Sequence, residues 1–435
     1  HSSDGNQFAY PVNSALLMFM DPKALSTNCI VSPDGDNYKA VIYLELVSET
    51  GNTMSYTLEK IYKAKDVVKN RGVPLGFSIW PDIKIDNWDQ YYLFYDGNAQ
   101  VNILPKNVFA VEDIRNKLES LTGTDKIKFI DNMLHSHQVV GEEIPIQQTT
   151  AVTELRSLKS SPEAVLCNVA TQSGGKSYTE HSKRVDVGLI LFPDPQIVAE
   201  TSNQWSVGID FGTTNSCVYF KENKENPKEL IFKNRINTPY DPGTDEEEIE
   251  EVMQAHKEFV PSREVTVPFM TILRERNFKE TTVENLPFRS NFIYYVDQVL
   301  YAIQDLPDDK RPLKFNLKWD EAEQSRIKSQ YFISQIILQA AVEAAAQGIK
   351  RENLQFNFSY PEAYSQDLLR SFRKITKRAI NIGLNDESYK SQEKTKFETE
   401  SISSALYFAQ GQKIAFANNV VTIDIGGGTS DLSLW

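Results

Sequence analysis

Cysteine, long apolar runs and an excess of basic charge are what this 435-residue sequence lacks. Its three cysteines, Cys29, Cys167 and Cys217, are too few and too scattered for a disulfide framework or a zinc site. No stretch approaches the roughly 20 consecutive apolar residues that cross a bilayer, so we expect no membrane span. No signal peptide is visible, and the cysteine usage suits a reducing compartment, so we expect a cytoplasmic protein.

The charge balance is acidic, with 46 Lys and Arg against 59 Asp and Glu and a net charge of −13. The densest basic cluster, Arg373, Lys374, Lys377 and Arg378, falls on one predicted helix. An acidic chain is a poor partner for phosphate backbones, so we expect no nucleic acid as primary partner. The apolar share of 40% and charged share of 24% are typical of globular proteins and exclude collagen-like, coiled-coil and wholly disordered chains.

The first two hundred residues are predicted to be rich in strands, because aromatic and β-branched runs alternate with turn clusters. Aromatic residues are dense between Phe77 and Tyr92, and a buried aromatic core explains them better than a ligand surface. We expect strands at Ala40–Val47, Gln90–Tyr95 and Gly188–Phe192, and a helix at Val111–Ser120.

The pattern changes from Trp205 onward. Apolar runs at Val207–Asp210, Cys217–Phe220 and Leu230–Phe232 predict a meander of strands around a glycine turn. The acidic stretch Asp241–Glu258 has few apolar residues and indicates a solvated helix or a disordered insertion.

Strands and helices then alternate towards the C-terminus, which predicts an α/β layer structure. The clearest helix is Ser329–Gly348, where apolar residues recur at three- and four-residue spacing and Gly348 provides a stop. We expect two further helices, Ser365–Asn381 with Gly383 at its end and Ile402–Gln410, and two strands, Leu354–Ser359 and Val420–Asp424.

Two segments share an unusual pattern: Val207–Ser216 and Val420–Asp431. Each has an apolar strand that ends in Asp, a glycine-containing turn, hydroxyl residues and a second strand. Glycines let main-chain N–H groups approach a phosphate closely, and threonine hydroxyls add donors. The Asp residues would anchor hydrated Mg²⁺ or an attacking water. Two such units could hold one triphosphate between them; the alternative is two tight hairpins whose glycines serve only turn geometry.

These motifs carry a family resemblance. Gly208–Val218 resembles the phosphate-1 loop of the Hsp70 chaperone ATPase, and Ile423–Leu432 resembles its phosphate-2 loop. Weaker resemblances lie at Arg263–Leu273, Asn357–Tyr364 and Glu400–Phe408, so that the resemblance spans roughly residues 205–435. It implies an α/β fold in which 203–435 is an actin-like (ribonuclease H-like) ATPase region of the actin, Hsp70 and sugar kinase superfamily. A β-rich region of unknown role, 1–202, precedes it.

The resemblance also implies roles for single residues. Asp210 and Asp424 would organise Mg²⁺ through its water shell, and Glu400 would hold a metal-bound or attacking water. Lys318 is the candidate for the lysine that orients the nucleophilic water, Pro361 would lie at a hinge, and Asp431 would support the second loop. The β-phosphate would be wrapped by Gly212, Thr213, Thr214 and Asn215, and the γ-phosphate faced by Gly426, Gly427, Gly428 and Thr429.

The sequence departs from the family pattern in three places. About 200 residues precede the first loop, and Glu400 is followed by Ser401 rather than Pro. The sequence also ends at Trp435, just after the second loop. We therefore expect a fragment of a longer protein, with an incomplete second lobe and an incomplete adenine pocket.

The expected function is Mg·ATP binding and slow hydrolysis that couples nucleotide state to a protein partner or client. The first alternative is a nucleotide-binding scaffold without turnover. A sugar or metabolite kinase and a filament-forming actin homologue stay open as weaker alternatives.

Three other motifs are better explained structurally. Gly174–Ser177 resembles the end of a P-loop, but Ala170 stands where a P-loop has glycine. His135 and His137 lack further ligands at useful spacing and indicate a solvated helix end. Cys217 has no histidine near it in sequence and is expected to be a buried strand residue rather than a nucleophile.

Overall fold

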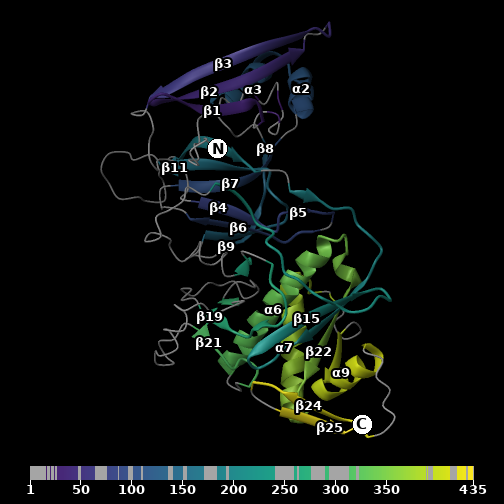
Figure 1. Ribbon diagram of the computed structural model, residues 1–435. Coiled ribbons are helices and arrows are strands. Elements are labelled where there is room, and N and C mark those ends of the chain that lie inside the picture. The colour runs from purple at the N-terminus through teal and green to yellow at the C-terminus, as the bar shows by residue number, and fades with distance from the viewer. Residues whose placement is uncertain are drawn as a thin grey trace, which may run out of the picture.

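The computed structural model stacks sheets and helices along one direction, from β1–β3 at one end to the hairpin β24–β25 at the other (Figure 1). Its composition is mixed α/β. The structure describes residues 16, 20, 24, 27–47, 50–63, 76–86, 88–96, 101–108, 111–135, 141–149, 154–170, 184–192, 195–240, 259–261, 264–275, 290–292, 313–319, 323–387, 389, 395–411, 419–427 and 430–434.

The first part is an antiparallel meander covered by two helices (Figure 1). Ile114 and Phe129 on the helices pack against Leu44 of the sheet, because this face carries its apolar residues at alternate positions. The predicted strand at 40–47 and the predicted helix at 111–120 are both confirmed. The elements are β1 (Cys29–Asp34), β2 (Asn37–Val47), β3 (Thr53–Lys63), α2 (Val111–Ser120) and α3 (Gly123–His135).

Two further antiparallel sheets follow, in the orders β17-β4-β6-β10-β9 and β12-β11-β7-β8. The predicted strands at 90–95 and 188–192 correspond to β6 and β12. Trp80 and Tyr91 are 0% and 2% exposed, so the aromatic cluster is core, as predicted. The strands are β4 (Gly76–Trp80), β6 (Tyr91–Asp96), β7 (Val101–Val108), β8 (Gly141–Glu143), β9 (Ile146–Thr149), β10 (Glu154–Leu158), β11 (Ala164–Ala170), β12 (Arg184–Leu191) and β17 (Asn237–Tyr240); β5 (Ile83–Lys84) and β13 (Gln196–Ile197) form a short parallel pair.

A fourth sheet holds the first glycine motif, in the order β16-β15-β14-β22-β23, with β18 paired to β15. Strand β14 runs antiparallel to β15 and parallel to β22, and β22 runs parallel to β23. The strands are β14 (Trp205–Asp210), β15 (Asn215–Glu222), β16 (Lys228–Glu229), β18 (Phe269–Met270), β22 (Leu354–Tyr360) and β23 (Thr395–Thr399). Beside it, β19 (Leu273–Glu275), β20 (Ser290–Phe292) and β21 (Leu313–Lys314) form a small sheet.

The predicted strand at 230–232 is wrong. The strand in this region is β16, and Phe232 forms only an isolated bridge with Val265. Leu230 and Phe232 are 2% and 0% exposed, so their apolar character reflects burial in the core. Both make main-chain hydrogen bonds, to Val218 and Val265, but no regular strand extends over 230–232. The acidic segment predicted at 241–258 lies outside the described residues.

Helix α6 (Glu323–Ala345) confirms the clearest helix prediction. Gly348 ends this region as expected: its φ is +80°, and a Cβ there would lie 2.3 Å from the Ala199 carbonyl oxygen. Helix α7 (Gln366–Leu384) begins at its N-cap Ser365, whose side chain accepts a hydrogen bond from the Leu368 N–H.

The predicted role of Gly383 as helix end is wrong. Gly383 lies inside α7, and the left-handed C-cap is Asn385, with φ +50°. A Cβ on Gly383 would lie 2.6 Å from the Ser334 carbonyl oxygen of α6. The glycine therefore permits close approach of the two helices.

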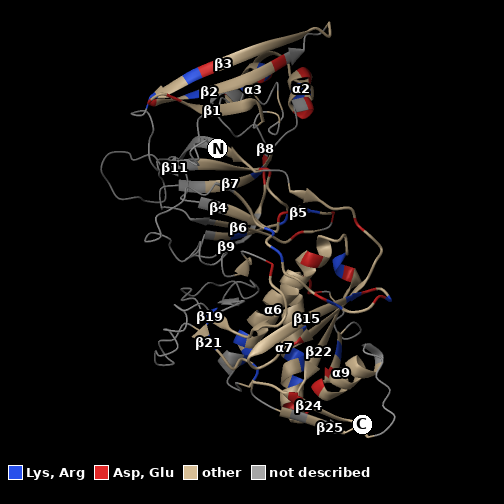
Figure 2. Ribbon diagram, viewed as in Figure 1, with Lys and Arg blue, Asp and Glu red and all other residues tan. Residues whose placement is uncertain are grey.

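Helix α9 (Glu400–Leu406) continues as a π-helical turn, η6 (Tyr407–Gly411), in agreement with the predicted helix at 402–410. The hairpin β24 (Val421–Ile425) and β25 (Ser430–Leu434) follows, close to the predicted strand at 420–424. The basic cluster Arg373, Lys374, Lys377 and Arg378 lies on α7, as predicted, and Figure 2 shows blue segments on this helix.

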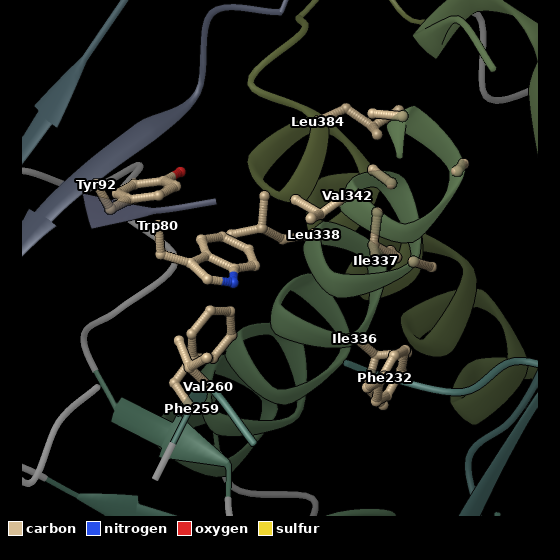
Figure 3. Packing of buried hydrophobic residues seen from close by; sticks show 14 of the residues in the cluster. Trp80, Tyr92, Phe232, Phe259, Val260, Ile336, Ile337, Leu338, Val342 and Leu384 are labelled. Atoms are coloured by element: carbon tan, nitrogen blue, oxygen red, sulfur yellow. The ribbon is translucent and has the colours of Figure 1, made fainter. Parts of the chain in front are cut away.

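One hydrophobic cluster contains residues from both sides of the predicted domain boundary at 202/203. The boundary itself stays a prediction. Trp80 meets Phe259 edge to face, with ring centroids 5.0 Å apart. Figure 3 shows Trp80 beside Leu338 of α6. Strand β17, from the second half of the chain, pairs with β4 of the first half.

Arg235, just before β17, also connects the two halves of the chain. Its guanidinium contacts the Glu343 carboxylate of α6 through two hydrogen bonds, at 3.1 and 2.8 Å. Its carbonyl oxygen accepts the Asp82 N–H at 2.8 Å. The Arg235 and Glu343 side chains are 11% and 5% exposed, so the pair is largely desolvated.

We therefore predict that Arg235→Met lowers the free energy of unfolding by about 3–5 kcal/mol, because it leaves the Glu343 carboxylate buried without its partner. Adding Glu343→Gln removes that charge and retains an oxygen for the Lys233 N–H, so stability should largely return. The control Lys228→Met breaks the exposed pair with Glu225 and should cost less than about 1 kcal/mol. Urea unfolding followed by circular dichroism measures these changes; equal losses for Arg235→Met and Lys228→Met would contradict the analysis.

Candidate functional site

The first glycine turn, Phe211–Thr214, is called the first loop, and it joins β14 to β15. Phe211 is 1% exposed and packs against Phe332 of α6 and Phe372 of α7, with centroid distances of 5.6 and 6.4 Å. A Cβ on Gly212 would lie 2.0 Å from the Asn215 carbonyl oxygen, so only glycine fits this turn. The loop is thus anchored from beneath, while Asp210 before it is exposed.

Asp210 lies at the end of β14, beside the end of the parallel strand β22. Its carboxylate accepts a 2.6 Å hydrogen bond from the Ser359 hydroxyl of β22. Asn357, on the same strand, donates to the Ser206 hydroxyl at 2.8 Å and holds the two strands in register. The carboxyl ends of parallel strands are the usual position for ligand-binding groups in α/β sheets.

The second glycine turn, 426–429, is called the second loop, and it joins β24 to β25. A Cβ on Gly427 would lie 1.8 Å from Thr214 Oγ1, so the two loops touch despite their distance in sequence. Asp424 pairs with Asp431 in the hairpin register, and Asp424 and Gly426 are exposed. Gly428, Thr429 and the side chain of Asp431 lie outside the described residues.

A buried ion pair borders the first loop. Lys318 Nζ lies 2.5 Å from Glu400 Oε1, and the two side chains are 3% and 12% exposed. The Tyr364 hydroxyl donates to the Lys318 carbonyl oxygen at 3.3 Å. Burial, with a smaller contribution from Glu400, raises the pKa of Tyr364 above its ordinary value, so the phenol stays protonated as a donor.

Trp319 contacts the first loop directly. Its indole Nε1 donates to Thr213 Oγ1 at 2.8 Å, and its ring meets Tyr364 edge to face at 5.2 Å. A small pocket lies beside these residues, lined by Phe211, Leu317, Lys318, Trp319, Arg326 and Tyr364 among others. The pocket is therefore continuous with the side chains that surround the loop.

The departure from the family pattern at Ser401 has a local explanation. Ser401 is 3% exposed, and its hydroxyl donates to the Glu362 carboxylate. Thr399 caps α9 by accepting the Ile402 N–H at 3.3 Å. These contacts fix the first turn of α9 and so the position of Glu400.

The structure brings many of the predicted site residues into one region: Asp210, Gly212, Thr213, Thr214, Lys318, Glu400 and Gly427. Asn215 begins β15 and pairs with Met270 of β18, and Pro361 is buried directly after β22. Sequence reasoning missed Ser359 and Trp319. Their positions, at a strand end level with Asp210 and next to Lys318, were the available signals.

The described cysteines and His135 are the parts of the minor motifs that the structure places. Cys29, Cys167 and Cys217 are free thiols. Burial above all, then Asp210, raises the pKa of Cys217 to about 11, so its thiol is protonated at neutral pH and is a poor nucleophile. His135 ends α3, whereas His137 and 174–177 fall outside the described residues.

Two further observations concern metal and membrane. Among the described residues, no three His, Cys, Asp or Glu side chains gather closely enough to hold a metal ion. Within the same part of the chain, no helix has the length and apolar character needed to cross a membrane.

No protein-family model matches the chain, and no curated protein matches it in sequence. The family resemblance of the two loops therefore stays an expectation.

We predict that Gly212→Ala destabilises the first loop by about 1–3 kcal/mol, because the added methyl overlaps the Asn215 carbonyl oxygen. The matched control is Gly208→Ala on β14, where the nearest atom, the Tyr219 carbonyl oxygen, lies 4.0 Å from the new Cβ. This control should stay within about 0.5 kcal/mol of the parent protein. Urea unfolding midpoints test the pair, and an equal effect of both substitutions would show that the turn is not constrained.

Proposed function

We propose that the protein binds Mg·ATP at the first and second loops, hydrolyses it slowly, and uses the nucleotide state to regulate a protein partner. The observation that carries the proposal is the contact between Thr214 and Gly427. Two turns of the same design, each preceded by a strand ending near an Asp, converge on one place. Convergence is what a shared triphosphate site requires, whereas independent hairpins need no such contact.

The strand arrangement supports the same proposal. In this α/β lobe, the antiparallel run β16-β15-β14 is followed by the parallel strands β22 and β23, and α6 and α7 pack on the first loop through Phe211. In such a lobe, ligand groups gather at the carboxyl ends of the parallel strands, where Asp210 and Ser359 lie.

The residues divide into roles by their chemistry. Gly212, Thr213 and Thr214 would offer main-chain and hydroxyl donors to phosphate oxygens. Asp210 and Asp424 would orient the water shell of Mg²⁺, which prefers oxygen ligands and retains several waters. When bound, the metal would neutralise phosphate charge. Because Thr214 touches Gly427, phosphate binding between the loops requires their separation at this point.

Lys318 and Glu400 are the groups available to orient a water for hydrolysis. Each would act by position and charge, which supply most of the catalysis in phosphoryl transfer. For this role the ion pair must open towards the ligand.

One observation favours the alternative of a nucleotide-binding scaffold. Lys318 and Glu400 are paired with each other and almost inaccessible to solvent. A site in which this pair stays closed would bind nucleotide and lack turnover. In either case we propose a cytoplasmic protein whose partner is another protein, in keeping with its acidic charge.

We predict that the purified protein binds ATP in a Mg²⁺-dependent manner, and that Asp210→Asn and Asp424→Asn each weaken this binding or slow turnover about 10–100-fold, the range for residues acting on a metal through its outer shell. Calorimetry measures binding and phosphate release measures turnover. The control Asp367→Asn removes an exposed carboxylate of α7 that pairs with Arg370 and should change neither.

Turnover lost in both variants supports the ATPase, and binding without turnover supports the scaffold. A folded protein that neither binds nor hydrolyses ATP would show that the loops serve only turn geometry. Binding that is insensitive to both substitutions would place the nucleotide elsewhere.

A further inference from the structure

We propose that Trp319 is a positioning residue of this site. It holds Thr213 so that the Thr213 hydroxyl donates a hydrogen bond to a phosphate oxygen. The inference rests on the proposed function, because it names how one loop residue recognises the ligand. It concerns a contact between the indole and the loop that the family resemblance does not include.

The chemistry of the two groups fixes the direction of their hydrogen bond. An indole Nε1–H can only donate, and a threonine hydroxyl can donate one bond and accept two. In the 2.8 Å contact, Thr213 Oγ1 is therefore the acceptor. The O–H of Thr213 is not used in this bond and can donate a hydrogen bond to an anionic oxygen.

Such a chain also strengthens the final bond. A hydroxyl that accepts a hydrogen bond becomes a better donor, because successive hydrogen bonds polarise one another. The half-buried Thr213 lies on the first loop between Gly212 and Thr214, where an approaching phosphate would meet it. The indole thus selects both the rotamer of Thr213 and the orientation of its proton.

The indole itself is held from two sides. The main-chain N–H of Trp319 donates to the Asn316 carbonyl oxygen at 3.1 Å. This bond closes a turn in which Asn316 has φ +55°. The indole ring meets Tyr364 edge to face, and the Tyr364 hydroxyl donates to the carbonyl oxygen of Lys318 in the same turn. A group fixed in this way can impose its geometry on Thr213.

The turn serves a second purpose through Lys318. Neighbouring residues of one turn direct a cation to Glu400 and an indole N–H to Thr213. The turn therefore connects the water-handling pair with the phosphate-binding loop.

The chain contains a matched control for the indole N–H. Trp205 begins β14, at the end of that strand away from the first loop, and has a buried Nε1 with no hydrogen-bond partner among the described residues. Its ring stacks on Phe220 at a centroid distance of 4.0 Å. Trp205→Phe therefore removes an indole from the strand that leads to the loop without removing a hydrogen bond to the loop.

The test is a double-mutant cycle on Mg·ATP affinity, measured by calorimetry with the full chain. Trp319→Phe keeps an aromatic ring and removes the donor, and it should weaken binding about two- to tenfold, the range for one neutral hydrogen bond. Trp205→Phe should leave the affinity within about twofold. In a Thr213→Val background, Trp319→Phe should have no further effect, and in a Thr213→Ser background its full effect should return.

The outcomes separate the inference from the proposed function. If the parent protein fails to bind Mg·ATP while folded, both are wrong. If it binds and Trp319→Phe has no effect, or has the same effect with and without the Thr213 hydroxyl, only the inference is overturned. A loss confined to proteins that retain the hydroxyl supports it, and circular dichroism of each variant confirms that the comparison is between folded proteins.

Discussion

The burial of helix α6 is the constraint on which the rest of the structure depends. From Phe332 to Ala345 its residues are at most 4% exposed, so this part of the helix must be covered on every side. The sheet that carries Asp210 meets it through Phe211, and α7 approaches it at Gly383. The first half of the chain reaches it through Trp80, as Figure 3 shows. Because one helix contacts all these parts, the first loop is fixed relative to the core of both halves.

Burial on every side also explains the polar residues of this part of the helix. Glu343 accepts hydrogen bonds from the Arg235 guanidinium and the Lys233 N–H, and Gln339 donates to the Phe259 carbonyl oxygen at 2.8 Å. Lys233 and Arg235 precede β17, the strand that crosses to the first half of the chain, and Phe259 follows β17 in the sequence. A buried polar group without a partner is costly, so these bonds favour one arrangement of the crossing segment over others.

The sequence predicted local elements better than their surroundings. Apolar spacing predicted α6, but spacing alone does not say what covers the polar face of the helix. That face is buried, since Arg235 and the Phe259 carbonyl oxygen approach it from distant segments. Leu230 and Phe232 were wrongly predicted as residues of a regular strand, because a short apolar run indicates burial and does not by itself distinguish a strand from other buried segments. Gly383 was read as a helix end because sequence does not reveal that a neighbouring helix needs its missing Cβ.

In the candidate site too, the sequence predicted local motifs better than contacts between distant segments. The repeated Asp–glycine–hydroxyl pattern predicted Asp210, Thr213, Thr214 and Gly427, since the pattern itself carries the chemistry. Ser359 and Trp319 were missed, although their positions in the sequence were the available signals, because their roles depend on strand register and on the turn at Asn316. The proximity of the two loops depends on long-range packing, because α9 contacts β22 and β23 of the sheet as well as both strands of the hairpin, and Figure 1 shows it beside them.

The central claim is that both loops bind one nucleotide. Hydrogen–deuterium exchange of the protein with and without Mg·ATP tests it most directly, because each loop is observed separately. The account predicts slower exchange in peptides covering 210–216 and 424–431 together, with no change in the distant strand β3. Protection of only one loop, or of neither under saturating nucleotide, would contradict it.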